Sequence, residues 1–193
     1  MSDGTKNFNH GNMVGLACDE GLVLATSSRD HLLYQLDDRI FLCAPRSANN
    51  REKILQVSAQ VEYLTRDLGR TITVGQVQDM LSYKYKDEDS VYTLTAGQDS
   101  SGLHIYSLKS NKGSRRVMYA ARGTEEDDIL SHLLEKWRQD LKLSEAEQLV
   151  RDLLKLNGND YVDLCVLYKA EEKELLDVPQ MQVIEGFDEN GSD

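Results

Sequence analysis

The 193-residue sequence lacks an excess of basic charge. It contains 22 Lys and Arg residues against 33 Asp and Glu residues, which gives a net charge of −11. Proteins that bind nucleic acid usually present a basic face to the phosphates, so we expect no nucleic-acid partner. Anionic membrane surfaces are disfavoured for the same electrostatic reason.

Long apolar runs are also missing. Stretches such as Gly21–Thr26 and Leu164–Tyr168 fall far short of the roughly 20 residues that span a bilayer. The opening residues, Met1 to Phe8, are polar and contain neither an apolar signal core nor an Arg-rich amphipathic stretch. We therefore expect no membrane segment and synthesis in the cytosol without export.

Cysteines are few, and they are widely spaced at Cys18, Cys43 and Cys165. An odd number at this spacing excludes a disulfide framework and a CxxC metal pattern. Each cysteine sits in an apolar, strand-like run. We expect all three to be reduced and to pack as small hydrophobic residues in the core.

Little in the sequence suggests a bound metal or cofactor, and we expect none. The glycines form no GxGxxG or P-loop pattern. Asp37-Asp38 fits a hairpin turn better than a catalytic pair, and Glu125–Asp128 fits the first turn of a helix better than a cation site. The histidines show no ligand spacing and are expected to be structural or surface residues: His10, His31, His104 and His132.

What the sequence does contain is a series of short apolar blocks separated by turn signals. Asp19-Glu20-Gly21 and Asp37-Asp38 each lie between two such blocks, which predicts two hairpins. A six-residue loop, Gly97–Gly102, and a basic turn, Lys112–Arg116, are expected between later strands. The predicted strands cover residues 13–18, 22–27, 32–36, 39–44, 91–96, 103–108, 117–121, 161–168 and 174–178.

Four helices are predicted in two pairs. Ser47 opens the first, and Gly69 ends it. Thr73 and Gln76 form a capping box at the second.

Thr124 opens the third helix, and Ser144 with Glu147 forms a capping box at the fourth. The fourth helix stops at Asn157-Gly158. The first helix has apolar residues spaced three and four apart on one face: Ile54, Val57, Val61, Leu64 and Leu68.

The order of strands, two helices, strands, two helices and strands predicts an α+β fold. Short turns imply antiparallel sheets, and helix pairs must cover their outer faces. We expect a four-layer αββα sandwich over residues 12–178, preceded by an extension (1–11) and followed by an acidic tail (179–193). The stretch Glu171–Asp193 holds eight acids and one lysine. This stretch and the basic turn are each expected either to be solvated or to contact a neighbouring chain.

Several motifs together resemble the beta-type subunits of the proteasome. They are Met13–Arg29, Asp38–Ala44 with Ser47-Ala48, Ala96-Gly97, Leu103–Tyr106 and Val162–Leu167. Their order and spacing match over residues 12 to about 178. Asp38–Ala44 and Tyr83-Lys-Tyr85 most resemble the caspase-like beta subunit. The alpha-type subunits fit poorly because their long N-terminal helical segment is missing. The resemblance implies the N-terminal nucleophile hydrolase fold, which is the same sandwich.

Active members of this family use an N-terminal threonine with a lysine and an aspartate. By the resemblance, these positions fall on Gly11, near Leu32 and on Ser27, none of which supplies the required group. The family's glycine-serine loop becomes Gly123–Glu126, and its second aspartate motif becomes Leu156–Asn159. The Arg29–Leu33 segment is also shorter than in the family. We therefore expect no catalytic residue in this chain.

The resemblance implies a non-catalytic, structural subunit of the 20S core particle in the cytoplasm and nucleus. Its partners would be the other alpha- and beta-type subunits of a hetero-oligomeric 28-mer, which serves ATP- and ubiquitin-dependent protein degradation. The Gly4-Thr5 junction leaves an alternative open, an active threonine endopeptidase matured at Thr5. A third possibility is a free-standing relative with a binding role outside the proteasome.

Overall fold

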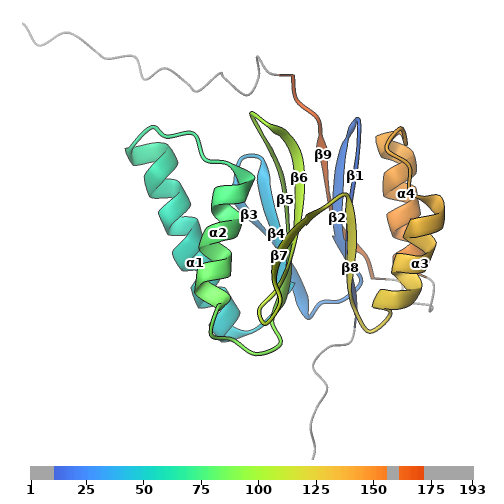
Figure 1. The fold of residues 1–193 in the computed structure, drawn as a ribbon, viewed down its shortest axis with the longest axis horizontal. Coiled ribbons are helices and arrows are strands. Elements are labelled where there is room, and N and C mark those ends of the chain that lie inside the picture. Colours follow the sequence, from blue (N-terminus) through green and yellow to red (C-terminus); the bar gives the residue numbers. More distant parts are fainter. Residues whose placement is uncertain (1–10, 156–160, 172–193) are drawn as a thin grey trace, which may run out of the picture.

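The computed structural model describes residues 11–155 and 161–171, and these form four layers (Figure 1). Two antiparallel sheets pack face to face, and a pair of helices covers the outer side of each sheet. The predicted αββα sandwich is confirmed. The predictions for residues 1–10, 157–158 and 174–193 lie outside the described residues.

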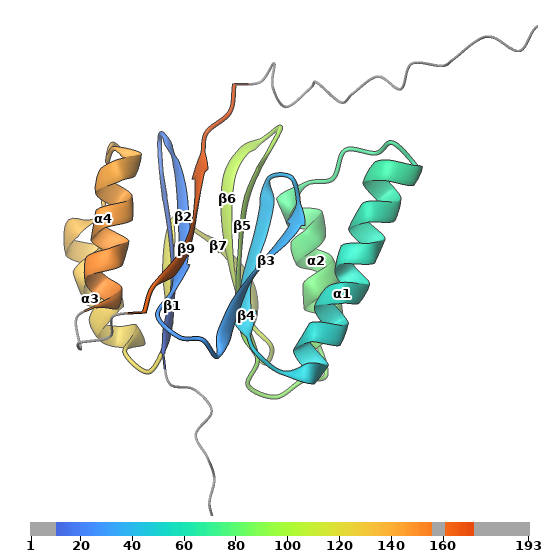
Figure 2. The same ribbon diagram turned by 180° about the vertical axis from the view of Figure 1, so that it is seen from behind.

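One sheet has the strand order β8-β1-β2-β9, with β8 and β9 at its two edges. Figure 2 shows the β9 edge of this sheet, with β9 beside β2. The other has the order β3-β4-β5-β6-β7. The strands of the first sheet are β1 (Asn12–Cys18), β2 (Gly21–Thr26), β8 (Tyr119–Gly123) and β9 (Asp163–Tyr168). Those of the second are β3 (His31–Asp37), β4 (Ile40–Pro45), β5 (Tyr92–Asp99), β6 (Gly102–Lys109) and β7 (Gly113–Val117).

Both predicted N-terminal hairpins are confirmed, but two later loops were predicted wrongly. Strands β5 and β6 pair from Tyr92↔Lys109 to Asp99↔Gly102, so most of the expected Gly97–Gly102 loop is strand. Gly97 is needed there because a Cβ would lie 2.5 Å from the carbonyl oxygen of Arg39. The expected basic turn at Lys112–Arg116 is largely strand β7, which pairs with β6.

The first helical pair is α1 (Ala48–Glu62) and α2 (Val74–Tyr85), with a π-helical segment η1 (Tyr63–Asp67) between them. Ser47 Oγ accepts a hydrogen bond from the Asn50 amide, and Thr73 and Gln76 form the predicted capping box. Leu68, in contrast, is 45% exposed, although the 3.6-residue periodicity predicted it on the buried face. The wider π-helical turn changes the phase of the helix before that residue.

The second pair is α3 (Glu126–Lys136) and α4 (Leu143–Leu154), and its predicted caps were wrong. Glu125, not Thr124, precedes the first residue of α3, and its side chain forms no capping bond. At α4, Glu145 accepts from the Lys142 amide at 3.0 Å, and Glu20 accepts from the Leu143 amide at 2.8 Å. A side chain from the β1–β2 turn therefore caps this helix in place of Ser144 and Glu147.

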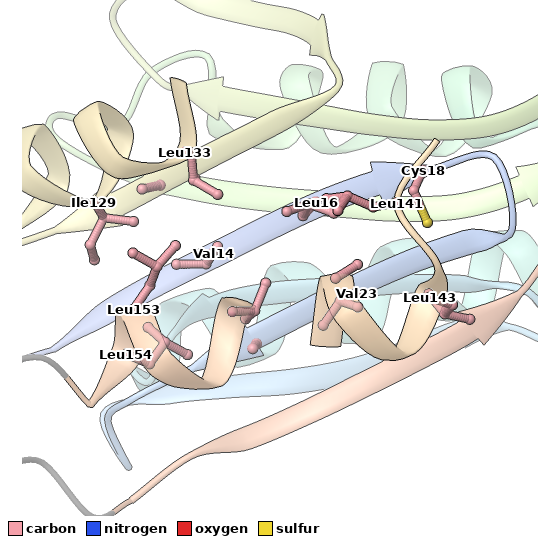
Figure 3. Packing of buried hydrophobic residues seen from close by; sticks show 14 residues of the cluster. Val14, Leu16, Cys18, Val23, Ile129, Leu133, Leu141, Leu143, Leu153 and Leu154 are labelled. Atoms are coloured by element: carbon pink, nitrogen blue, oxygen red, sulfur yellow. The ribbon is translucent and has the colours of Figure 1, made fainter. Parts of the chain in front are cut away.

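Apolar side chains fill the three interfaces between the four layers. Under α3 and α4, Ile129, Leu133 and Leu153 lie over the β1–β2 hairpin (Figure 3). Cys18 and Cys43 are buried as predicted, whereas Cys165 is half-buried. Burial raises the pKa of the Cys43 thiol far above its ordinary value. Among the described residues, no helix combines the length and apolar content that crossing a membrane requires.

Candidate functional site

Gly11 and Ser27, two of the positions that the resemblance assigns to catalysis, lie at one end of the sandwich, where three chain segments meet. Strand β1 begins there, β2 ends there, and β8 runs into α3. The register places Asn12 opposite Gly123, and the Ser27 amide donates to the Asn12 carbonyl at 2.9 Å. The structure thus brings Gly11, Ser27 and the β8–α3 connection together.

Gly11, at the assigned nucleophile position, has no room for a side chain. A Cβ built on its backbone would lie 2.1 Å from the Cβ of Ser28. Its φ of +138° is also a conformation that residues with a side chain rarely adopt. A threonine could not occupy this position unless the backbone moved.

We expect Gly11→Ala to lower the free energy of unfolding by about 1–3 kcal/mol, because a side chain is forced into occupied space. Urea unfolding measures this loss. Gly102→Ala is the matched control, since Gly102 has a similar positive φ of +115° but no atom within 4 Å of the added Cβ. Equal losses for the two variants would show that the backbone conformation alone, and not contact with Ser28, disfavours a side chain at position 11.

Asn12 ties the start of β1 to the start of α3. Its amide nitrogen Nδ2 donates to Glu125 Oε2 at 2.8 Å, and its Oδ1 accepts from the Glu125 backbone N–H at 2.9 Å. Its own backbone N–H donates to Ser27 Oγ at 3.0 Å. Asn12 is only 3% exposed, so this reciprocal pair is a buried structural link.

The other two assigned positions also lack the expected charge. Ser27, at the aspartate position, is buried and accepts the Asn12 amide hydrogen bond, but a neutral hydroxyl cannot stabilise a protonated base as a carboxylate can. Leu32, at the lysine position, is a partly buried residue of β3 and lies opposite Ala44. The resemblance therefore points to side chains that supply neither charge.

A small cavity of about 180 Å³ opens beside this end of the sheets, and the sequence analysis did not predict it. Two of its charged groups, Arg122 and Glu126, are held in a network. Arg122 Nη1 donates to Glu126 Oε1 at 2.5 Å, and Arg122 Nη2 donates to Ser107 Oγ at 2.7 Å. The cavity is lined by Tyr92, Lys109, Arg122, Gly123, Thr124 and Glu126.

His31 links the two sheets near the same end. Its Nδ1 lies 3.2 Å from Thr26 Oγ1, and its Nε2 lies 3.5 Å from the Tyr92 hydroxyl. Burial lowers the pKa of His31, and the nearby Asp30 carboxylate offsets only part of that effect. The imidazole is thus favoured in its neutral form, and its neighbouring hydroxyl on Thr26 is fully buried.

We expect stability to fall as the pH drops below about 6.5, the ordinary histidine pKa, because the unfolded chain takes up a proton that the folded His31 resists. The loss continues until the pH passes below the folded pKa, with a slope of at most about 1.4 kcal/mol per pH unit. Urea unfolding between pH 7.5 and about 5 should show a flatter profile for His31→Gln than for His132→Gln. An unchanged slope in His31→Gln would contradict this assignment.

Ser101, His104 and Asp99 resemble a hydrolytic triad in composition but not in geometry. His104 Nε2 faces both Asp99 Oδ1, at 3.1 Å, and Ser101 Oγ, at 2.8 Å, and Ser101 Oγ also donates directly to Asp99 Oδ1 at 2.6 Å. In a hydrolytic triad the serine hydroxyl and the carboxylate bind different ring nitrogens of the histidine, whereas here both face Nε2, so this arrangement does not activate the serine.

The Asp99 carboxylate instead has a structural role. Its Oδ2 accepts from the Val74 amide at the start of α2, at 2.9 Å. Burial raises the pKa of Asp99, but the hydrogen bonds from Ser101 and Val74 outweigh it, so the pKa is lowered overall. The cluster fixes the β5–β6 turn to the start of α2.

Comparison with known proteins decides the family. The family model described as "Proteasome subunit" matches residues 8–160, which is most of the chain. The chain belongs to the proteasome subunit family. Its fold is accordingly that of the family's αββα sandwich.

The related proteins are beta-type proteasome subunits. Over 186 residues the chain is 23% identical to proteasome subunit beta type-2 of Saccharomyces cerevisiae, covering 85% of this chain and 71% of that protein. It is 22% identical to proteasome subunit beta type-10 of Bos taurus, with 84% and 67% covered. It is 24% identical to the proteasome subunit beta of Methanosarcina thermophila, with 84% and 88% covered. These relatives make the chain a beta-type member.

Sequence patterns in this proteasome subunit did not reveal the contacts that surround the assigned positions. Gly11 and Ser27 lie together as the resemblance implied. The partnership of Asn12 with Glu125 was missed, because 113 residues separate them in the sequence. No group of residues suited to hold a metal ion occurs in the part of the chain that the structure describes.

Proposed function

We propose that this chain is a non-catalytic beta-type subunit of the 20S proteasome core particle. It would complete the beta ring and help to form the wall of the proteolytic chamber. One observation carries the proposal: at the assigned nucleophile position, Gly11 is packed so tightly against Ser28 that no side chain fits.

The chemistry of the surrounding groups supports the same proposal. A hydroxyl nucleophile needs an adjacent base, because it is weak at its own pKa. In the candidate site, Arg122 donates hydrogen bonds to Glu126 and Ser107, and His31 contacts the buried Thr26 and the partly buried Tyr92. Ser27 contributes a neutral hydroxyl where a carboxylate would be required. These residues build a rigid end to the sandwich and do not form a proton-transfer chain.

The partners in this proposal are other alpha- and beta-type subunits, in a hetero-oligomeric particle of the cytoplasm and nucleus. Residues 12–178 would form the ring-building domain, with 1–11 and 179–193 as extensions. The similarity to the caspase-like beta subunit stays a prediction. The yeast and bovine relatives carry the names beta type-2 and beta type-10.

The proposal is tested by isolating the chain from its native source through a C-terminal tag, sizing it and identifying the co-purifying proteins. We expect one large particle that contains many related subunits. Recovery as a lone chain, or as an assembly of this chain only, would refute the assignment and leave only the family and the fold established. The alternative nucleophile, Thr5, lies outside the described residues.

A further inference from the structure

The β6–β7 hairpin is a basic surface on an acidic chain. It carries Lys109, Lys112, Arg115 and Arg116, and no acidic residue occurs between Ser100 and Thr124, although the whole chain has a net charge of −11. None of the four basic side chains forms an ion pair with another described residue. Their charge is therefore not neutralised within the described part of the subunit.

Strand β7 is also the edge of its sheet. It pairs with β6 on one side, and no strand of the described chain pairs with its other side. Alternate residues of an edge strand direct their N–H and C=O groups outward, where another chain can bind them. Residues 113–116 are all exposed, so these backbone groups are accessible over most of the strand.

The two arginines of β7 lie on opposite faces of the sheet, because successive side chains of a strand alternate. Arg115 lies opposite Ser107 and shares its face with Val117, which packs in the core between the sheets. Arg116 lies opposite Tyr106, which packs on the side of α1 and α2. A strand placed along this edge would therefore meet a guanidinium on each of its faces.

A second copy of the same edge does not fit. Pairing of β7 with another β7 would bring arginines close to arginines, and like charges on paired strands destabilise a sheet. Carboxylate side chains on both faces of an added strand would instead meet Arg115 and Arg116. The charge of the two arginines and the unpaired backbone groups of the β7 edge therefore favour the same kind of partner, an extended segment with successive acidic residues.

We propose that the β7 edge binds an acidic, extended segment of a neighbouring subunit, which adds to the sheet as a further strand. The inference rests on the proposed function, because it needs a neighbour in the ring. The backbone hydrogen bonds give the segment its direction and register, and the arginines select its charge. A nucleic acid is a poor alternative, since the rest of the acidic chain repels it.

Photo-crosslinking in the assembled particle tests this contact directly. Ser114, exposed in the middle of the β7 edge, is replaced by p-benzoylphenylalanine in the tagged chain, and the crosslinked peptide is identified by mass spectrometry. We expect a crosslink to an acidic segment of one other subunit. A crosslink to an acid-free segment, to this chain's own residues or to nucleic acid would overturn the inference, as would no crosslink.

Charge reversal tests the chemistry. In the Ser114 crosslinking chain, Arg115→Glu with Arg116→Glu should lower the yield at least about tenfold, because two attractive cross-strand pairs become repulsive. Lys136→Glu with Arg138→Glu makes the same change in charge at exposed positions at the end of α3 and just beyond it, and should leave the yield unchanged. An unchanged yield in the β7 double variant would refute an acidic partner.

The two proposals fail separately in these experiments. A chain that is recovered in the particle but does not crosslink from Ser114 would overturn the β7 contact only. A chain that is absent from any large particle would overturn the proposed function first. Circular dichroism of each variant checks that the exposed substitutions leave the fold intact.

Discussion

Replacing Leu24 by alanine should lower the free energy of unfolding by about 2–5 kcal/mol, the range for truncating a buried leucine. Leu24 is fully buried in β2 and belongs to the apolar cluster between the two sheets, which includes Leu94 and Ile105 of the facing sheet. The rigid strands on both sides limit how far the cavity can collapse. Urea unfolding of the purified chain measures the loss.

The matched control is Leu134→Ala, which removes the same atoms from a side chain that is 74% exposed on α3. Its effect should stay within about 0.5 kcal/mol. If Leu24→Ala proved as mild as this control, the two sheets could not be packed face to face as the structure has them. The comparison therefore tests the central interface of the fold.

The second large effect is expected for Asn12→Asp, which replaces the side-chain NH₂ group by an oxygen and adds a buried negative charge. The new carboxylate would lose the hydrogen bond that Asn12 Nδ2 donates and would face the Glu125 carboxylate. Leaving a charge unpaired at such a site costs about 3–5 kcal/mol at neutral pH. Thermal or urea unfolding at pH 7 would show the loss.

The pH dependence of this variant has a definite sign. Burial and the Glu125 charge raise the pKa of the introduced carboxyl in the folded state. The deficit is therefore small below the ordinary Asp pKa of about 3.9, grows as the pH rises from there to the folded pKa, and is constant above it. Asn111→Asp, at an exposed turn position, is the control and should change stability little. A deficit at pH 7 no larger than that of the control would contradict the Asn12–Glu125 link.

Local signals predicted much of the fold. The β1–β2 and β3–β4 hairpins follow from turn residues between apolar blocks, and the Thr73–Gln76 capping box marks the start of α2 as the sequence indicated. In these cases the residues that decide the structure are neighbours in the chain. The αββα layering then follows, because amphipathic helix pairs must cover the sheets.

The errors arose where tertiary contacts decide the local structure. Strand β7 has no apolar alternation, because it is an exposed edge strand that β6 holds in place, and its arginines were read as a turn. The start of α4 depends on Glu20, which lies 123 residues away in the β1–β2 turn. Neither contact leaves a pattern within a short window of sequence.

The assignment of a site to Gly11 and Ser27 stays a prediction, although the structure brings these two residues close together. The resemblance located Gly11 and Ser27, and the structure adds the reason why Gly11 is fixed as glycine: Ser28 fills the space that a side chain would need. The cavity beside Arg122 and the His31 link between the sheets depend on residues from different strands. Such assemblies become visible only when the chain is folded.

The most direct test of the account is to treat the purified particle with a peptide vinyl sulfone, which modifies N-terminal threonine nucleophiles, and to map this chain by mass spectrometry. The account predicts an intact Gly4–Thr5 bond and no modification of this chain, while catalytic subunits of the same particle react. Cleavage before Thr5, with the reagent attached to Thr5, would contradict it and identify an active threonine endopeptidase.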